Sequence, residues 1–256
     1  MNKIENTFKE LKRTGRKALI PYLMAGDPSP DATKQFVSEL EEAGADIIEL
    51  GVPFSDPLAD GPVIQRAHER ALQKGISLKK VIALVKEIRQ SSHIPLILMT
   101  YYNPVFKFGV ETFIKEAADS GVDGVIIPDL IPDEAHDFIS VARKHKIDTI
   151  FLLAPTSTLE RIKRVVKVST GFIYYVSITG ITGAKLAIGD PMKDTLKLIK
   201  SNTNKPVAVG FGISNPEEAA EISKLAEGVI IGSAIVRLIA EGKDIKDFVK
   251  KIKEML

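Results

Sequence analysis

The feature that most constrains the fold is a repeated order, in which a short apolar run rich in β-branched residues is followed by a segment of helical periodicity. The eight apolar runs lie at residues 18–23, 46–50, 95–99, 124–127, 149–153, 172–177, 206–209 and 228–231. The helical segments lie at residues 31–43, 78–90, 110–120, 133–144, 159–169, 191–200 and 216–225. No long linker interrupts this order. The pattern therefore predicts an α/β protein with a single domain, residues 1–256, folded as a closed parallel (β/α)₈ barrel of the TIM type.

Two segments extend this pattern at the ends of the barrel. Phe8 and Leu11 stand at helical spacing before the first run and predict an N-terminal helix that caps the bottom of the barrel. Residues 233–240 predict a short extra helix after the eighth strand, followed by a last helix at 244–256. A doubly wound open sheet is the alternative architecture, but no strand is followed by the Gly-x-Gly-x-x-Gly sequence of dinucleotide sites.

Composition excludes several classes of function. A net charge of +2 without clustered aromatic and basic residues argues against nucleic-acid binding. The chain contains no cysteine, which removes disulfides and thiolate chemistry. No segment approaches the ~18 apolar residues of a membrane span, and we expect a cytoplasmic protein. The histidines show no metal-ligand spacing, so we expect no metal and place each of them at the surface: His68, His93, His136 and His145.

An acid inside an apolar strand is the strongest functional signal. Glu49 lies at the end of the run that Gly51 and Pro53 terminate. Burial raises the pKa of a carboxyl group, so Glu49 would carry a proton if it points into the barrel mouth. Asp60 follows in a turn-rich loop, where we expect a wetter site and an ionised carboxylate. The alternative is that Glu49 forms a structural ion pair.

Glycines after the last two strands indicate a phosphate site. Gly210-Phe211-Gly212 follows the seventh run, and Gly232-Ser233 follows the eighth and opens the short extra helix. In barrels of this kind, phosphate is often held by these two loops and by the backbone N–H groups at the helix N-terminus. The alternative is that these glycines only make tight turns. The long loop at residues 177–190, with repeated Thr-Gly steps, predicts a lid over the site.

Five sequence motifs, in this order, show which family the chain resembles. They are Leu-Met-Ala-Gly-Asp-Pro at 23–28, Glu-Leu-Gly-Val-Pro-Phe-Ser-Asp-Pro-Leu-Ala-Asp-Gly-Pro at 49–62, Ser-Ile-Thr-Gly-Ile-Thr-Gly at 177–183, Val-Gly-Phe-Gly-Ile at 209–213 and Gly-Ser-Ala-Ile-Val at 232–236. Over its whole length the chain resembles the tryptophan synthase alpha subunit. The resemblance implies a lyase that cleaves indole-3-glycerol phosphate to indole and glyceraldehyde 3-phosphate.

The resemblance also assigns roles to residues of this chain. Glu49 matches the acid that transfers protons, and Asp60 matches the carboxylate that holds the indole N–H. The residues that match phosphate contacts are Gly183, Gly212, Gly232 and Ser233. Those that match the indole and propanol pocket are Tyr22, Ile64, Tyr174 and Phe211. Thr182 matches the lid residue that bonds to Asp60 on closure.

The family implies a partner, a beta subunit that holds pyridoxal phosphate and completes an α2β2 assembly. This chain itself would then hold no cofactor. Apolar loop residues at one rim of the barrel mouth fit such an interface, because isolated proteins tend to avoid exposed apolar patches. The interface residues that we predict are Pro53, Phe54, Asp56, Pro57, Leu58, Asn103, Pro104 and Pro132, together with the neighbouring Phe106, Leu130 and Ile131.

Two other functions fit parts of the same pattern. A phosphorylated-sugar isomerase would share the phosphate site but would place its acid and base on other strands. A regulatory subunit without its own chemistry would only activate a beta-type partner, although the chain keeps both Glu49 and Asp60. An assay of indole formation by the isolated chain separates these alternatives from the lyase.

Overall fold

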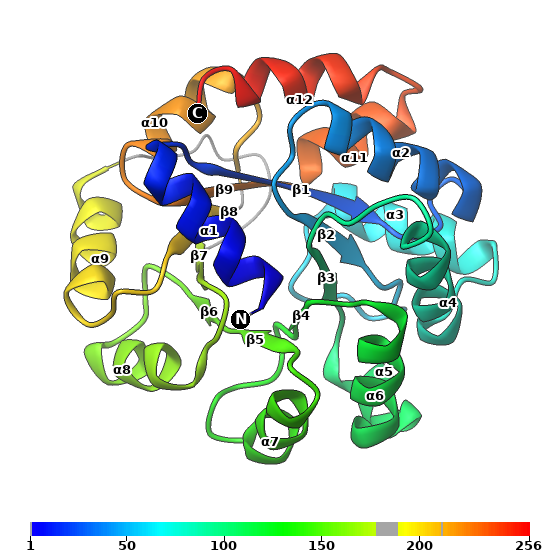
Figure 1. Cartoon of the computed structure of the whole chain (residues 1–256), viewed down its shortest axis with the longest axis horizontal. Helices are drawn as coiled ribbons and strands as arrows, with labels where there is room; N and C mark the ends of the chain where they lie inside the picture. Colours follow the sequence, from blue (N-terminus) through cyan, green and yellow to red (C-terminus); the bar gives the residue numbers. More distant parts are fainter. Residues whose placement is uncertain (1, 178–188, 211) are drawn as a thin grey trace.

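The computed structural model describes residues 2–177, 189–210 and 212–256 and shows a ring of helices around a barrel of parallel strands (Figure 1). The strands are β1 (Ala18–Met24), β2 (Ile48–Gly51), β3 (Leu96–Met99), β4 (Gly124–Ile126), β5 (Asp148–Ile150), β6 (Leu152–Leu153), β7 (Ile173–Val176), β8 (Val207–Gly210) and β9 (Gly228–Ile231). They coincide with the eight predicted runs, because β5 and β6 both lie in the fifth. The predicted barrel is confirmed.

The strand order shows how the sheet closes. Neighbouring strands follow one another as β5-β4-β3-β2-β1-β9-β8-β7-β6, and only Phe151 separates β5 from β6. The two ends of the sheet are therefore two halves of one interrupted strand. The strand register pairs Tyr22 of β1 with Glu49 of β2, and Glu49 with Ile97 of β3. These residues lie near the mouth of the barrel.

Helices surround the sheet, and their apolar faces join one core. Within the described residues they are α1 (Lys3–Thr14), α2 (Pro30–Glu42), α3 (Pro62–Gln73), α4 (Leu78–Ile88), α5 (Tyr102–Phe108), α6 (Val110–Ser120), α7 (His136–Lys144), α8 (Leu159–Val168), α9 (Asp190–Ser201), α10 (Pro216–Ser223), α11 (Ser233–Ala240) and α12 (Ile245–Lys253). None of those described is long and apolar enough to cross a membrane.

Two helices were missing from the sequence prediction. Helix α3 begins at Pro62, which suits the first turn of a helix, directly after the Asp60 loop. The residues before Pro62 are typical of turns, so the start of this helix was not predicted. Helix α5 is only seven residues long, too short for its periodicity to show. Both omissions matter because α3 and the start of α5 border the barrel mouth.

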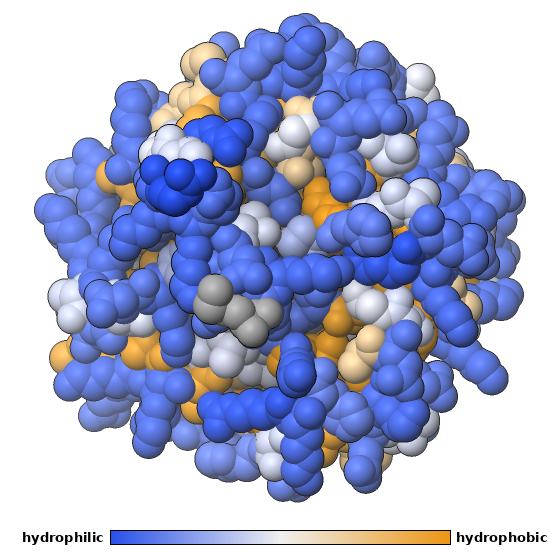
Figure 2. Space-filling model, in the orientation of Figure 1, coloured by the Kyte–Doolittle hydropathy of each residue, from blue (hydrophilic) through white to orange (hydrophobic). Residues whose placement is uncertain are grey.

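The bottom of the barrel is closed by α1, as predicted. Ile4, Phe8 and Leu11 of this helix are buried, and the Phe8 ring lies 5.6 Å from the ring of Phe172, the residue just before β7. Figure 1 shows α1 lying across the barrel toward the viewer, and Figure 2 shows that this face of the molecule is largely hydrophilic outside. The predicted extra helix is also present as α11.

Candidate active site

Glu49 lies in the barrel lumen, near its mouth. It is the second residue of β2 and is only 1% exposed. Gly51 is two residues further and so faces the same side, where an added Cβ would lie 2.6 Å from Cζ of Tyr22. Within the described residues, neither carboxyl oxygen of Glu49 has a hydrogen-bond partner. The structural ion pair that the sequence left open is therefore not formed there.

The surroundings of Glu49 keep it protonated at neutral pH. Burial, and secondly the charge of Asp60, raises its pKa to about 8. An ionised carboxylate without partners would lose its hydration and gain nothing in return. Glu49 can thus give up a proton to a bound ligand and take one back.

Asp60 lies in a different environment from the one predicted. Its side chain is buried, so the loop does not expose it to water as expected. Two side chains reach its Oδ2 atom: the Tyr101 hydroxyl donates at 2.7 Å, and His68 Nε2 lies at 3.0 Å. The carboxylate also lies just before the N-terminus of α3, where the helix dipole favours negative charge.

His68 and Tyr101 are site residues that the sequence prediction missed. His68 is 3% exposed, which shows that its predicted surface position was wrong. The sequence held one signal for it: with α3 recognised, His68 falls on the same buried face as Ile64, Ala67 and Ala71. Tyr101 follows β3 and caps no helix with its side chain. Burial, and then the charge of Asp60, raises the pKa of the Tyr101 phenol, so it remains a hydrogen-bond donor.

Tyr22 and Tyr174 face this pair of acids from β1 and β7. Both are buried, and both pKa values are raised well above the usual range by burial and then by the carboxyl groups of Asp60 and Glu49. Each tyrosine lies over a glycine on the next strand, since a Cβ on Gly51 or Gly210 would collide with the phenol of Tyr22 or Tyr174. The structure thus brings four predicted site residues together: Tyr22, Glu49, Asp60 and Tyr174.

Three of the four predicted phosphate residues, Gly212, Gly232 and Ser233, are described and lie at the same mouth. Gly212 has a φ of +83°, a conformation that favours glycine. Gly232 precedes α11, whose first turn has no side-chain cap, and lies against Tyr22, whose Cβ would be 3.4 Å from an added Cβ. Ser233 is half-buried at the first position of that helix, and Ile64 is buried in α3. The other predicted ligand residues, Thr182, Gly183 and Phe211, lie outside the described residues.

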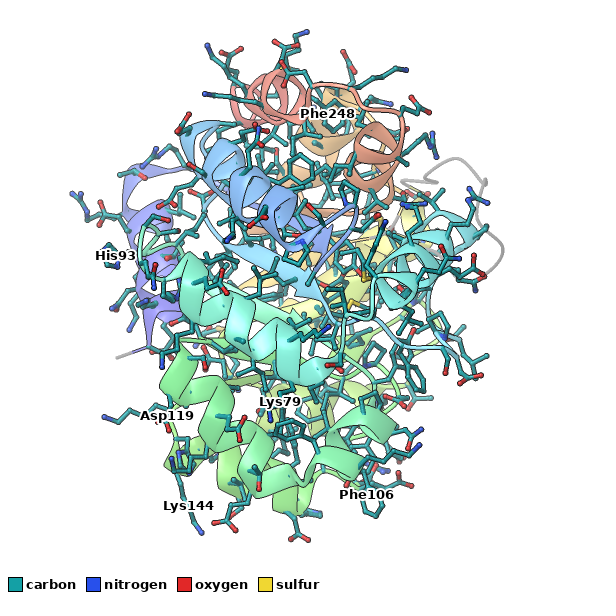
Figure 3. All side chains as sticks on the ribbon, turned by 90° about the vertical axis from the view of Figure 1, so that its right-hand side faces the viewer. Lys79, His93, Phe106, Asp119, Lys144 and Phe248 are labelled. Atoms are coloured by element: carbon teal, nitrogen blue, oxygen red, sulfur yellow. The ribbon has the colours of Figure 1, made fainter. Side chains whose placement is uncertain are left out.

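The rim beside the site exposes apolar side chains. Leu58 is 93% exposed and Phe106 is 67% exposed. Figure 3 shows Phe106 projecting from the side of the molecule away from α1. A hollow of about 550 Å³ opens here, lined by Phe54, Asp56, Leu58, Ala59, Tyr101, Asn103, Pro128 and Asp129. Pro53, Pro132 and Leu130, which we predicted at the same surface, are buried within the chain.

No metal-binding set is evident in the described part of the chain, where no three His, Asp or Glu side chains are placed to hold a metal ion. The chemistry that the site supports is proton transfer, because the carboxyl group of Glu49 has a pKa raised to about 8 and lies close enough to Asp60 to be affected by its charge.

Comparison with known proteins agrees with this geometry. The family model described as tryptophan synthase alpha chain matches residues 8–256. The tryptophan synthase alpha chain of Caldanaerobacter subterraneus subsp. tengcongensis is 48% identical over all of both chains, and that of Geotalea uraniireducens is 49% identical over 94% of this chain and 90% of its own.

Solved structures give the same result. Tryptophan synthase subunit alpha from Legionella pneumophila has a TM-score of 0.90 at 37% identity, covering 100% of this chain and 98% of its own. A chain of tryptophan synthase from M. tuberculosis, in the aminoacrylate-bound form, has a TM-score of 0.91 at 36% identity, covering 100% and 99%. The fold, the placement of Glu49 and Asp60, and these matches lead to one conclusion. The chain belongs to the tryptophan synthase alpha chain family.

Proposed function

We propose that this protein cleaves indole-3-glycerol phosphate to indole and glyceraldehyde 3-phosphate, with Glu49 and Asp60 as its catalytic residues. The observation that carries the proposal is the buried, unpartnered carboxyl group of Glu49, with its pKa raised to about 8, facing a carboxylate that is held by two side chains. Membership of a lyase family fits this arrangement.

The reaction needs a proton donor and a base at nearly the same place. Glu49 gives its proton to C3 of the indole ring, and positive charge develops on the ring nitrogen. Asp60 accepts a hydrogen bond from the ring N–H and stabilises that charge. The Glu49 carboxylate then takes the proton of the hydroxyl on the adjoining glycerol carbon. The bond from that carbon to C3 breaks, its electron pair restores the indole ring, and the carbon becomes the aldehyde of glyceraldehyde 3-phosphate.

The remaining residues hold the two ends of the substrate. The phosphate is bound by backbone groups of Gly183, Gly212, Gly232 and Ser233, and the open N-terminus of α11 favours its negative charge. The indole and propanol part lies among Tyr22, Ile64, Tyr174 and Phe211, with Thr182 bonding to Asp60. Tyr22 lies between the phosphate end and the indole end of the proposed site. It is next to Gly232, and the charges of Asp60 and Glu49 contribute to its raised pKa.

We further propose that a beta subunit covers the rim at Phe54, Asp56, Pro57, Leu58, Asn103 and Pro104, in an α2β2 assembly. The exposure of Leu58 and the adjoining hollow support this surface. Pyridoxal phosphate would belong to the beta subunit, and this chain would hold no cofactor. A cytoplasmic location and the absence of a metal stay predictions.

The decisive experiment compares wild type with Glu49→Gln in an assay of indole release from indole-3-glycerol phosphate. The variant keeps the shape of the side chain but carries no transferable proton, so we expect turnover to fall by about 10²–10⁴-fold. Binding of glycerol phosphate, measured by calorimetry, should be unchanged. Substantial turnover by the variant would contradict the role of Glu49.

The same assay separates the other functions. If wild type releases no indole alone or with a beta subunit added, the regulatory alternative holds. If it instead converts phosphoribosyl substrates, the isomerase alternative holds.

A further inference from the structure

We propose that His68 is a positioning residue that fixes the Asp60 carboxylate in the orientation needed to receive the indole N–H. This inference rests on the proposed function of Asp60. It concerns α3, whose side chains other than Ile64 have no role in the reaction described above. The support comes from the hydrogen bonds of the histidine ring, its burial and its neighbours.

Both nitrogens of the His68 ring have partners. The backbone N–H of Phe54 donates to Nδ1 at 3.0 Å, and Nε2 lies 3.0 Å from Oδ2 of Asp60. A backbone N–H can only donate, so Nδ1 must be the unprotonated nitrogen. The ring proton of neutral His68 is therefore on Nε2, and Nε2–H donates to Asp60. The fixed main chain of the Phe54 loop thus selects the tautomer that serves the carboxylate.

The donors to Asp60 all approach one oxygen. Nε2 of His68 and the hydroxyl of Tyr101 both donate to Oδ2, and the Tyr101 oxygen in turn accepts the backbone N–H of Ala59 at 3.1 Å. Two fixed donors on Oδ2 set the rotation of the carboxylate about its Cβ–Cγ bond. Among the described residues, Oδ1 has no such donor, so it is the oxygen left to accept from a ligand.

Packing makes this arrangement rigid. The His68 ring meets the Tyr101 ring edge-on, with centroids 6.3 Å apart, and the Phe54 ring lies 5.2 Å from that of Tyr101. His68 is on the buried face of α3, where an apolar side chain would pack without needing partners for two nitrogens. A catalytic group is effective only when neighbouring side chains hold it in its productive geometry.

The two hydrogen bonds of His68 can be removed one at a time. In His68→Gln the amide nitrogen reaches the position of Nε2 and keeps the donor to Asp60, but the acceptor for Phe54 is lost. In His68→Asn the side-chain oxygen takes the position of Nδ1 and keeps that acceptor, but nothing reaches Asp60. His68→Ala removes both. Glu69→Gln, on the exposed face of the same helix, is the matched control.

We expect kcat for indole release to fall by about 10–100-fold in His68→Ala and His68→Asn, the effect of one hydrogen bond to a charged group. His68→Gln should restore most of that loss. The dissociation constant of glycerol phosphate should stay within about twofold in all variants, because the contacts of His68 are with Phe54, Asp60 and Tyr101 and not with the residues proposed to bind phosphate. The rescue by Gln but not by Asn separates orientation of Asp60 from filling of the core.

Three results would overturn the proposal. One is wild-type kcat in His68→Ala, and another is rescue by Asn equal to that by Gln. The third needs no variant: nitrogen NMR of the wild type showing the Nδ1-protonated tautomer contradicts the hydrogen bond itself, even if the variants fail to fold. Failure of the proposed function looks different, because wild type would then release no indole.

Discussion

Glu49 and Asp60 show how two buried carboxyl groups of one site differ in their hydrogen-bond partners. Glu49 is surrounded by apolar strand residues and has no hydrogen-bond partner in the described part of the chain. Asp60 receives hydrogen bonds from Tyr101 and His68 and lies by a helix N-terminus. Both side chains are buried, so burial alone does not distinguish them. Their hydrogen-bond donors do, and without any donor, burial raises the pKa of Glu49 to about 8.

The buried proton of Glu49 makes stability depend on pH. Its pKa is about 8 in the folded chain against an ordinary value of 4.5, so its contribution to stability is fully present below pH 4.5 and is lost as pH rises to about 8. We expect the free energy of unfolding of wild type to fall across this range by up to about 1.4 kcal/mol per pH unit relative to Glu49→Gln. Urea unfolding of both proteins from pH 5 to 9 measures the difference.

The comparison with the variant cancels the effect of other groups. Asp148, at the bottom of the barrel, has a pKa raised by burial from 3.8 to about 6, so in both proteins its contribution to stability is lost as pH rises across that range. A difference between wild type and Glu49→Gln that does not grow with pH would show that Glu49 is already ionised in the folded chain.

Sequence predicted Glu49 and Asp60 because strand alternation and loop position are local properties. It could not predict His68 and Tyr101 as partners of Asp60. His68 follows Asp60 by eight residues across the start of a helix that was not recognised, and Tyr101 comes from the next strand. The position of Asp60 in water was predicted wrongly for the same reason, since its cover comes from these two residues.

At the scale of elements, two strands at the mouth, β2 and β8, each end in a glycine that lies against a tyrosine side chain of the neighbouring strand. Gly51 ends β2 beside Tyr22, and Gly210 ends β8 beside Tyr174. A side chain at either glycine would occupy the place of the phenol. The absence of a side chain at each glycine thus leaves room for the ring of the neighbouring tyrosine.

We therefore expect Gly51→Ala to displace Tyr22 and to destabilise the protein by about 1–3 kcal/mol, the usual cost of overpacking. The double variant with Tyr22→Ala should be less than additive by more than 0.5 kcal/mol, because the collision is then removed. Thermal unfolding of the single and double variants measures this coupling. Gly189→Ala is the control, because the one described residue that its added Cβ meets is Pro191, at an ordinary 3.5 Å. Additive effects would contradict the contact.

The two helices that the sequence did not reveal also have a physical reason. Helix α3 starts inside a loop whose prolines and glycines suggest turns, and α5 lies where a loop was expected. A crossover between two parallel barrel strands needs only one helix. A second helix in the same connection is therefore not predicted by the alternation of strands and helices along the sequence. The regular crossovers were predictable because each has a long apolar face.

At the scale of the whole molecule, the two ends of the barrel differ. One end is closed by α1, and the other carries Glu49 and Asp60, the residues proposed to bind phosphate and the exposed apolar rim. The rim lies on the loop that also holds Asp60 in place, since Phe54 and Ala59 donate to His68 and Tyr101. A partner bound there would touch the same loop whose backbone donates hydrogen bonds to the two partners of Asp60.

We expect Leu58→Glu to weaken binding of a tryptophan synthase beta chain by roughly tenfold or more, because an exposed anchor of this size is worth about 1.5–3 kcal/mol when buried. The melting temperature and the rate of indole release by the isolated chain should be unchanged, since Leu58 is 93% exposed. Calorimetry of complex formation measures the effect. Leu198→Glu, on the exposed side of α9, is the control, and equal weakening by both would place the interface elsewhere.

Helix α1, which closes the bottom of the barrel, limits the routes by which ligands can enter and leave. Ile4 and Phe8 fill that end, so in the described part of the chain the way in and out for reactant and products is at the mouth. A partner seated on the rim would then stand across the only exit route that the described residues leave, and departure of indole would become a property of the assembly. The lone barrel would release its product into water, and the same barrel with its mouth covered would deliver it to its neighbour.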